Sequence, residues 1–262
     1  MKLFFREYGA GKPVIILHGL FGMSDNWMTI AKRLADNNFR VIVPDLRNHG
    51  QSPHAEEWDY KIMSHDVFEL MENEKISRPV IIGHSMGAKV AMQMAAMHQE
   101  KISALVLVDM APKAYPIQHA KILAVLNELV KQGPFTRNKA EQLLFRRIHD
   151  AATVKFLLKN LYWKSDDKGG IGLSFRFNLK VITQRIKSMG VEITFQAPVK
   201  LPALIIRASN SEYVTNEDIT TFKKSFLKAK AVTIKDSGHW VHADKPEEFI
   251  EVILAFIKLV FQ

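Results

Sequence analysis

Six short apolar runs constrain the fold of this chain more than any other feature. They are nearly continuous and rich in valine, isoleucine and leucine, as is typical of strands buried on both faces of a parallel sheet. Helical spacing of apolar residues lies between most of them. The runs are VIILH (14–18), VIVPD (41–45), VIIGH (80–84), ALVLVD (104–109), ALIIR (203–207) and AVTIK (231–235), and the clearest helical patterns cover 27–34, 88–97 and 249–260. The pattern predicts an α/β fold with a mostly parallel, doubly wound sheet.

The alternation of strands and helices is interrupted between residues 115 and 198. We interpret this stretch as a helical lid, inserted after the strand that ends near Asp109. Ligands of doubly wound sheets bind at the carboxyl ends of the strands, so a lid there would cover the binding site. The predicted organisation is a core made of residues 1–114 and 199–262, with the lid segment 115–198 between them. Helical patterns within the lid segment cover 117–131, 137–148, 151–163 and 175–189.

Composition limits the classes of protein to consider. The chain has 262 residues, of which 47% are hydrophobic, so wholesale disorder is not expected. It has no cysteine, which excludes disulfides and thiolate catalysis. No stretch approaches the ~18 apolar residues of a membrane-spanning helix, and the start MKLFFREYGA does not resemble a signal peptide. We therefore expect a soluble, cytoplasmic protein without stable membrane insertion, whose oligomeric state is open.

The formal charge of +9 is concentrated in one part of the chain. Residues 112–200 hold 16 Lys and Arg against 6 Asp and Glu, so the remainder of the chain is nearly neutral. A basic segment of this kind could attract an anionic substrate or surface, or it could be the solvated faces of amphipathic helices. Zinc-finger spacing and runs of five basic residues are absent, so we expect no nucleic-acid partner.

The stretch IIGHSMGAKVAM (81–92) carries the strongest chemical signal. A buried strand runs directly into G-x-S-x-G, and a helical pattern follows. In this context the motif indicates a nucleophile turn, in which Ser85 has a strained backbone and side chains at positions 83 and 87 would collide with it. The alternative is a glycine-rich turn needed only for packing. We expect Ser85 to be the nucleophile.

A serine nucleophile needs a base and donors for the oxyanion. In DSGHWVH (236–242), His239 follows the last predicted strand, and His242 competes with it from nearer the next helix. We expect His239 to be the base. One oxyanion donor should be the backbone N–H of Met86, and the other that of Leu20 or Phe21 in LHGLFGMSDNW (17–27).

A further loop, PDLRNHGQS (44–52), carries two charged residues, Asp45 and Arg47. Side chains of this kind often fix a loop through hydrogen bonds to the backbone. We assign both a structural role.

The chain resembles the α/β-hydrolase superfamily over essentially its whole length, and within it the small bacterial serine esterases of the YbfF type. The resemblance implies hydrolysis of acyl esters, with acyl-CoA thioesters also suggested, and it implies no cofactor and no metal. It rests on HGLFGMSDNW, PDLRNHGQSP, IGHSMGAKVAM, LVDMAPKAY, FRFN, ALIIRASNSEYV and SGHWVHADKP.

The resemblance also bears on the acid of the triad. Most members of the superfamily carry it after the strand that ends here at Arg207, where this chain has Ser-Asn-Ser. We therefore expect Asp109, at the end of ALVLVD, to orient His239 and to stabilise its imidazolium. Glu212 is the main alternative. Asp218 and Asp236 are weaker ones.

The predicted function is a carboxylesterase or thioesterase that acts on short to medium acyl chains, with a small-molecule ester or thioester as its partner. Two alternatives stay open. One is a C–C bond hydrolase or a lyase of the same fold, because sequence separates these activities poorly. The other is a binding protein with little turnover, although a pure binder would not need three catalytic groups.

Overall fold

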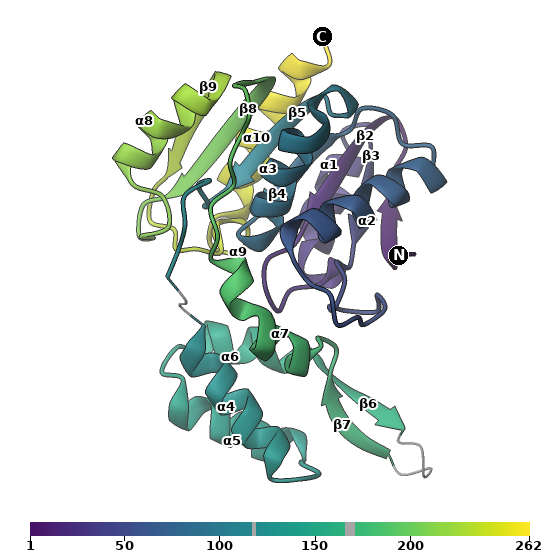
Figure 1. Cartoon of the computed structure of the whole chain (residues 1–262), viewed down its shortest axis with the longest axis vertical. Helices are drawn as coiled ribbons and strands as arrows, with labels where there is room; N and C mark the ends of the chain where they lie inside the picture. The colour runs from purple at the N-terminus through teal and green to yellow at the C-terminus, as the bar shows by residue number, and fades with distance from the viewer. Residues whose placement is uncertain (117–118, 166–170) are drawn as a thin grey trace.

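One mixed sheet of seven strands forms the centre of the protein (Figure 1). The structure is a computed structural model, and it describes residues 1–116, 119–165 and 171–262. The strand order is β1-β3-β2-β4-β5-β8-β9, and every neighbouring pair is parallel except β1 with β3. The strands are β1 Phe5–Tyr8, β2 Lys12–Leu17, β3 Phe39–Pro44, β4 Val80–His84, β5 Ala104–Val108, β8 Val199–Ala208 and β9 Phe226–Ile234. All six predicted strands are present, and the predicted fold class is confirmed.

Helices cover both faces of the sheet, so two apolar cores form. On one face α1 (Met28–Ala35) and α10 (Pro246–Val260) pack against the even-numbered residues of β2 and β4, such as Ile16 and Ile82. On the other face α2 (Tyr60–Asn73) and α3 (Met86–His98) pack against the odd-numbered ones, together with α8 (Asn216–Ser225). Alternate side chains of each strand are thus buried on opposite faces, which explains why the runs are continuously apolar. A short helix, α9 (Val241–Asp244), precedes α10.

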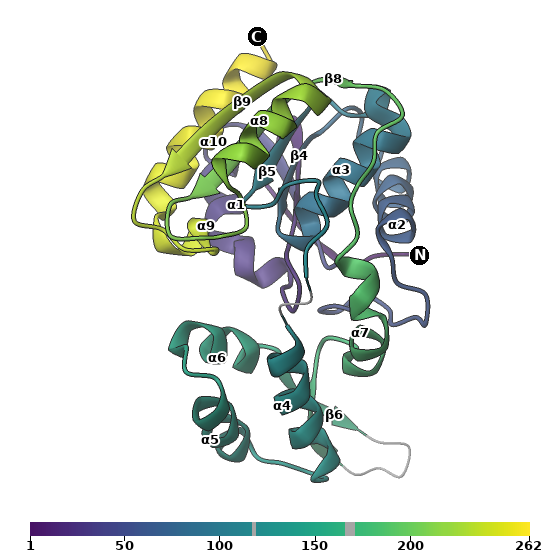
Figure 2. The same ribbon diagram turned by 60° about the vertical axis from the view of Figure 1, so that its left-hand side comes forward.

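Residues 120–165 and 171–189 form a separate group of elements at the carboxyl ends of the strands (Figures 1 and 2). None of them joins the seven-stranded sheet. They are α4 Ala120–Lys131, α5 Arg137–Arg147, α6 Ala151–Leu158, β6 Leu161–Ser165, β7 Ile171–Phe175, α7 Leu179–Arg185 and the 3-10 helix η3 Ile186–Met189. The other 3-10 helices are η1 Ser24–Trp27 and η2 Gln99–Lys101.

The sequence prediction of this region was wrong in two places. The expected helix over 151–163 ends at Leu158, and β6 and β7 form a two-stranded antiparallel sheet. The expected helix over 175–189 begins only at Leu179, after β7 has ended, and continues as η3. Residues 117–118, at the start of the first expected helix, lie outside the described residues. Within the described ranges, no helix is long and apolar enough to cross a membrane.

The loop after β3 contains the two charged side chains that the sequence analysis treats as structural. The carboxylate of Asp45 accepts hydrogen bonds from the backbone N–H groups of Ser24 (2.6 Å) and Gln51 (2.7 Å). Arg47 makes a two-pronged ion pair with Asp66 of α2, with N–O distances of 2.5 and 2.7 Å. Both partners of this pair are buried. The loop is therefore fixed by charge-assisted bonds that lie away from the solvent.

We expect Asp66→Asn to destabilise the fold by about 3 kcal/mol, because it leaves the Arg47 charge buried without its counterion. Urea denaturation would measure the loss. The matched control is Glu247→Gln, which breaks the exposed ion pair of Glu247 with Arg33 and should cause no measurable change. Equal effects of the two substitutions would contradict the role given to the buried pair.

Candidate active site

Ser85 occupies a sharp turn between β4 and α3. Its backbone angles are φ 53° and ψ −116°, a region that residues other than glycine rarely adopt. The flanking glycines make this turn possible. A Cβ at Gly83 would lie 2.4 Å from the carbonyl oxygen of Gly87, and one at Gly87 would lie 2.2 Å from that of Leu17. Any larger residue at either position would push the helix away from the sheet. The geometry agrees with the strain and the crowding that the sequence predicts at positions 83, 85 and 87.

Asp109 and His239 meet across the carboxyl ends of β5 and β9. The Nδ1 of His239 donates a hydrogen bond to Oδ2 of Asp109 at 2.8 Å. The carboxylate is fully buried, and it also accepts from the backbone N–H of Ala208 (3.1 Å) and from the hydroxyl of Ser211. Because Nδ1 carries the proton, Nε2 of His239 is left as the basic nitrogen of the ring.

The other candidate acids lie elsewhere. Glu212 is exposed and, within the described ranges, makes no hydrogen bond to His239. Asp218 accepts from Thr215 at the start of α8 and pairs with Lys113 at 2.7 Å. Asp236 is exposed at the end of β9. Of the acids weighed from the sequence, the structure brings only Asp109 to the histidine.

The loop after β2 brings Leu20 to Ser85. Leu20, Ser85 and Met86 line one small pocket, and a Cβ on Gly19 would be 3.2 Å from Cβ of Ser85. Among the residues that the structure describes, neither the N–H of Leu20 nor that of Met86 donates to another protein group. Two backbone donors beside a serine can hold a negatively charged oxygen.

A residue from beyond the core holds this loop. Phe21 has a φ of 60°, and its carbonyl oxygen accepts from the side-chain amide of Asn160 at 2.9 Å. Asn160 is buried, next to the start of β6. The role of Asn160 could not be predicted from the sequence, because nothing local to Asn160 indicates a partner 139 positions away.

Two further histidines, His84 and His242, lie near the turn, with ring centroids 5.1 Å apart. His84 donates from Nε2 to the carbonyl oxygen of His239 at 2.9 Å, which ties the histidine loop to β4. His242 is partly buried and stacks on Trp27 with ring centroids 4.1 Å apart, and within the described ranges it makes no hydrogen bond to Asp109. Burial lowers the pKa of His242 to about 3 and also places the pKa of His84 well below its usual range. These rings are therefore neutral near pH 7.

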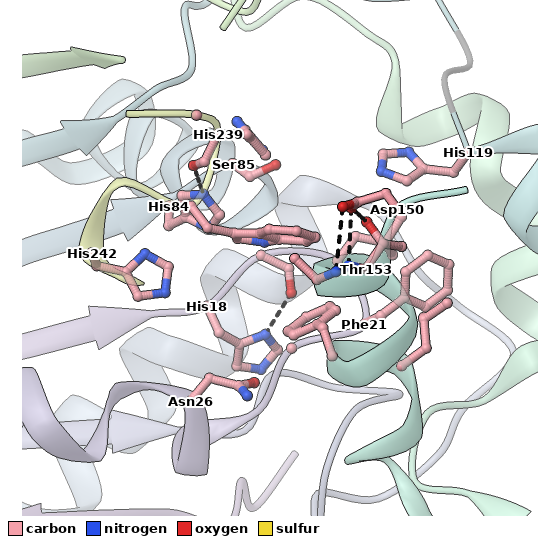
Figure 3. Close-up of a pocket in the computed structure, with 18 of the residues that line it drawn as sticks. His18, Phe21, Asn26, His84, Ser85, His119, Asp150, Thr153, His239 and His242 are labelled. Atoms are coloured by element: carbon pink, nitrogen blue, oxygen red, sulfur yellow. Dashed lines mark hydrogen bonds between the residues drawn. The ribbon is translucent and has the colours of Figure 1, made fainter. Parts of the chain in front are cut away.

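Two pockets share Ser85 in their lining, and Figure 3 shows the larger one. The larger one has a volume of about 480 Å³ and is also lined by His239, His119, Asp150 and Phe156. Its described lining contains no lysine or arginine. The smaller pocket, of about 50 Å³, is mostly apolar. It is lined by Leu20, Tyr60, Ser85, Met86, Met110, Tyr115, Pro116, His119, Ile186, Met189, Gly190 and Tyr213.

Two further side chains at this site, Tyr213 and Ser211, were not given a role from the sequence. The ring of Tyr213 stacks on that of His239, with centroids 3.9 Å apart and planes inclined by 16°. Ser211 occupies the loop where an acid is usual in this fold, and its hydroxyl instead donates to Asp109. The one signal in the sequence was the missing acid itself. No group of three or more His, Asp or Glu residues in the described ranges could hold a metal ion.

A serine turn, a histidine held by a buried carboxylate and paired backbone donors define a site of the serine-hydrolase type. Comparison with known proteins agrees with this class. The family model described as "alpha/beta hydrolase fold" matches residues 12–162. The chain is 32% identical to the esterase YbfF of Escherichia coli, over 98% of this chain and 99% of that protein. It is 34% identical to an sn-1-specific diacylglycerol lipase of Xenopus tropicalis, over 95% of this chain and 78% of that protein.

A solved structure shows the same architecture. The marine microorganism esterase is 39% identical, covers 98% of this chain and superposes with a TM-score of 0.92. The chain belongs to the α/β-hydrolase family. The predictions of this family, of its fold and of a carboxylesterase-type hydrolase are thereby confirmed.

The lowered pKa of His242 predicts how stability depends on pH. An unfolded histidine binds a proton near pH 6.5, whereas His242 binds one in the folded state only near pH 3. The unfolded state therefore takes up more protons between these values, and stability that is fully present above pH 6.5 is lost as the pH falls. We expect His242→Phe to reduce this loss by about 1.4 kcal/mol per pH unit. Urea denaturation from pH 7 to pH 4.5 would measure it. The control His65→Gln, at an exposed position, should leave the slope unchanged.

Proposed function

We propose that this chain hydrolyses carboxylic esters through a covalent acyl-enzyme. Ser85 is the nucleophile, His239 the general base and acid, and Asp109 the group that orients His239. The N–H groups of Leu20 and Met86 hold the oxyanion. The observation that best supports this assignment is the 2.8 Å bond between His239 Nδ1 and Asp109 Oδ2, in a cavity that Ser85 also lines.

The chemistry follows from the proton on Nδ1. His239 Nε2 takes the hydroxyl proton of Ser85 as its Oγ attacks the ester carbonyl, and the carbonyl oxygen becomes an oxyanion between the two N–H donors. The intermediate then breaks its bond to the alcohol oxygen, which receives the proton from Nε2. Water repeats the sequence on the acyl-serine and releases the carboxylic acid. The buried carboxylate of Asp109 stabilises the imidazolium that forms in both halves of the reaction.

We also propose that the lid segment 115–198 builds the walls of the substrate site. Helices α4 and α6 and the residues just before them supply Ile122, Phe156 and His119 to the larger pocket, and η3 supplies Met189 to the smaller one. The leaving group must receive its proton from His239, which lines only the larger pocket. The alcohol therefore lies in the larger pocket and the acyl chain in the smaller one.

The small volume beside Ser85 limits the acyl chain. About 50 Å³ holds on the order of two to four carbon atoms. The described lining of the larger pocket offers no lysine or arginine to a phosphate, so a neutral alcohol suits it better than a coenzyme A thioester. We therefore propose short-chain esters as the preferred substrates.

Replacing the acid tests the triad. We expect Asp109→Asn to lower kcat by ~10³–10⁴, because an asparagine no longer holds the productive tautomer of His239 or stabilises its charge. The matched control is Glu212→Gln, which should stay near wild type. Steady-state hydrolysis of p-nitrophenyl acetate would measure both. A large loss of kcat in Glu212→Gln, with kcat near wild type in Asp109→Asn, would overturn the assignment.

A chain-length series tests the division of the site. With p-nitrophenyl esters of two to sixteen carbons, we expect the highest kcat/KM at two to four carbons and a fall of ~10-fold or more by eight, since a longer chain cannot enter the smaller pocket. Ser85→Ala is the blank for each substrate. A preference for long chains would place the acyl group in the larger pocket instead, and no turnover above the blank would reject ester hydrolysis.

A further inference from the structure

One lysine of the nucleophile's own helix is buried and has no role in the chemistry above. Lys89 lies one turn into α3, and its backbone N–H donates to the carbonyl oxygen of Ser85 at 3.2 Å. Its side chain is 1% exposed. Lysine is almost never buried so completely unless its ammonium has partners, so its surroundings need an explanation.

The ammonium of Lys89 donates to three backbone carbonyl oxygens. They belong to Pro112 (2.8 Å), Lys113 (2.5 Å) and Val191 (2.9 Å). The first two lie where the chain leaves β5 for the lid segment, and the third lies where it returns toward β8. We call residues 112–115 and 190–193 the lid stems. One side chain thus contacts both lid stems from the helix that begins at the nucleophile.

The two lid stems also pair with each other. The N–H of Tyr115 donates to the carbonyl oxygen of Gly190 at 2.8 Å. The N–H of Ile193 donates to the carbonyl oxygen of Pro112, also at 2.8 Å. Only two backbone bonds join them, which by themselves would form a weak pairing. The carbonyls that Lys89 contacts lie within these short segments, so the ammonium adds three charge-assisted bonds to the pair.

The site fits an ammonium better than another group. Three convergent carbonyl oxygens match the three N–H donors of a lysine, and in the described ranges no carboxylate lies within ion-pair distance of Nζ. The ring of Tyr115 lies 5.2 Å from the ammonium and adds a cation–π contact. Burial, opposed by Glu192 and reinforced by Lys113, lowers the pKa of Lys89 to about 7. The bonds to the carbonyls favour the charged form.

The lid stems form part of the wall of the smaller pocket. Tyr115 and Gly190 line it together with Ser85 and Met86. The hydroxyl of Tyr115 also donates to the carbonyl oxygen of Tyr213 at 2.6 Å, and the ring of Tyr213 stacks on His239. A shift of the lid stems would therefore widen the acyl pocket and disturb the packing of the histidine.

We propose that Lys89 is a positioning residue that clamps both lid stems to helix α3 and thereby fixes the size of the acyl pocket beside Ser85. The effect on substrates rests on the proposed function, whereas the clamp itself does not. The clamp can therefore be tested without a substrate.

The substrate-free test is hydrogen exchange of the native enzyme. In the wild type, the amides of Tyr115 and Ile193 should exchange slowly, although they lie in connecting loops. In Lys89→Met, which keeps the length of the side chain and removes its donors, both should exchange ~10-fold faster or more, while the amides of Ile82 and Val106 in the central strands keep their protection. Fast exchange of the lid stems in the wild type, or unchanged exchange in the variant, would overturn the clamp. Fast exchange in the wild type would overturn the clamp even where the variant does not fold.

The second readout is selectivity. We expect Lys89→Met to lower the ratio of kcat/KM for the butyrate ester to that for the octanoate ester by ~5-fold or more, because a looser pocket admits longer chains. The ratio is independent of the fraction of folded enzyme, so general destabilisation would not change it. The matched control is Lys121→Met, which makes the same substitution at an exposed position of α4 and should leave the ratio unchanged. An unchanged ratio in Lys89→Met would overturn the effect on the pocket. If the wild type hydrolysed neither ester faster than Ser85→Ala does, the proposed function would be rejected instead.

Discussion

The carboxylate of Asp109 is the buried charge around which the site is organised. A carboxylate removed from water is costly unless hydrogen bonds replace its hydration. Here the replacements come from three places, namely the backbone of Ala208, the hydroxyl of Ser211 and the ring of His239. The first two come from the end of β8 and the loop directly after it, and the third comes from the loop after β9, so these two segments are held at the end of β5. The position of the histidine is thus a consequence of how the protein satisfies one buried charge.

This arrangement explains why much of the core could be predicted from the sequence. Strands buried on both faces must be continuously apolar, and a nucleophile turn needs its two glycines, so local sequence carries both signals. Ser85 and His239 could be found in this way. Strand β1 could not, because FREY is short and half exposed at the edge of the sheet. Asp109 needed the resemblance to a family, since its partners lie 99 and 130 positions away.

The residues that sequence reasoning missed are polar side chains with distant partners. Lys89 stands in a helical pattern where a lysine predicts an exposed position, yet it is buried against carbonyls of both lid stems. Asn160 and Tyr213 are similar cases, since their partners come from other parts of the chain. No strand was predicted for β6 and β7, and the helix predicted over 151–163 extended into the first three residues of β6. Polarity alone predicts exposure, and only the folded structure shows which polar groups have partners inside.

The basic charge of the lid segment also needed the structure to be understood. Its lysines and arginines are mostly exposed, for example Lys121, Lys139 and Arg146, and the described lining of the larger pocket contains none. These charges lie on exposed faces of the lid helices and not in the described lining of the larger pocket. Composition left two explanations of the basic charge open, namely attraction of an anionic substrate or surface and solvated helix faces. The described lining of the larger pocket favours the second for the inside of the pocket.

Backbone strain shows why the lid segment is more than a cover. Phe21, Ser85 and Asp109 all have positive φ at the ends of β2, β4 and β5, a conformation that costs on the order of 1–3 kcal/mol at each residue. Such strain persists only where surrounding bonds hold it. The N–H of Ser85 donates to the carbonyl oxygen of Val108 in the next strand, and the N–H of Asp109 donates to the carbonyl oxygen of Ile206. The sheet therefore holds the strained backbone of Ser85 and Asp109. Phe21 lies beyond the sheet, and the bond to its carbonyl comes from Asn160 of the lid segment. The loop that carries Leu20 is therefore set in part by the segment that closes over it, and a change in the lid segment would reach the backbone donor beside Ser85 as well as the pocket walls.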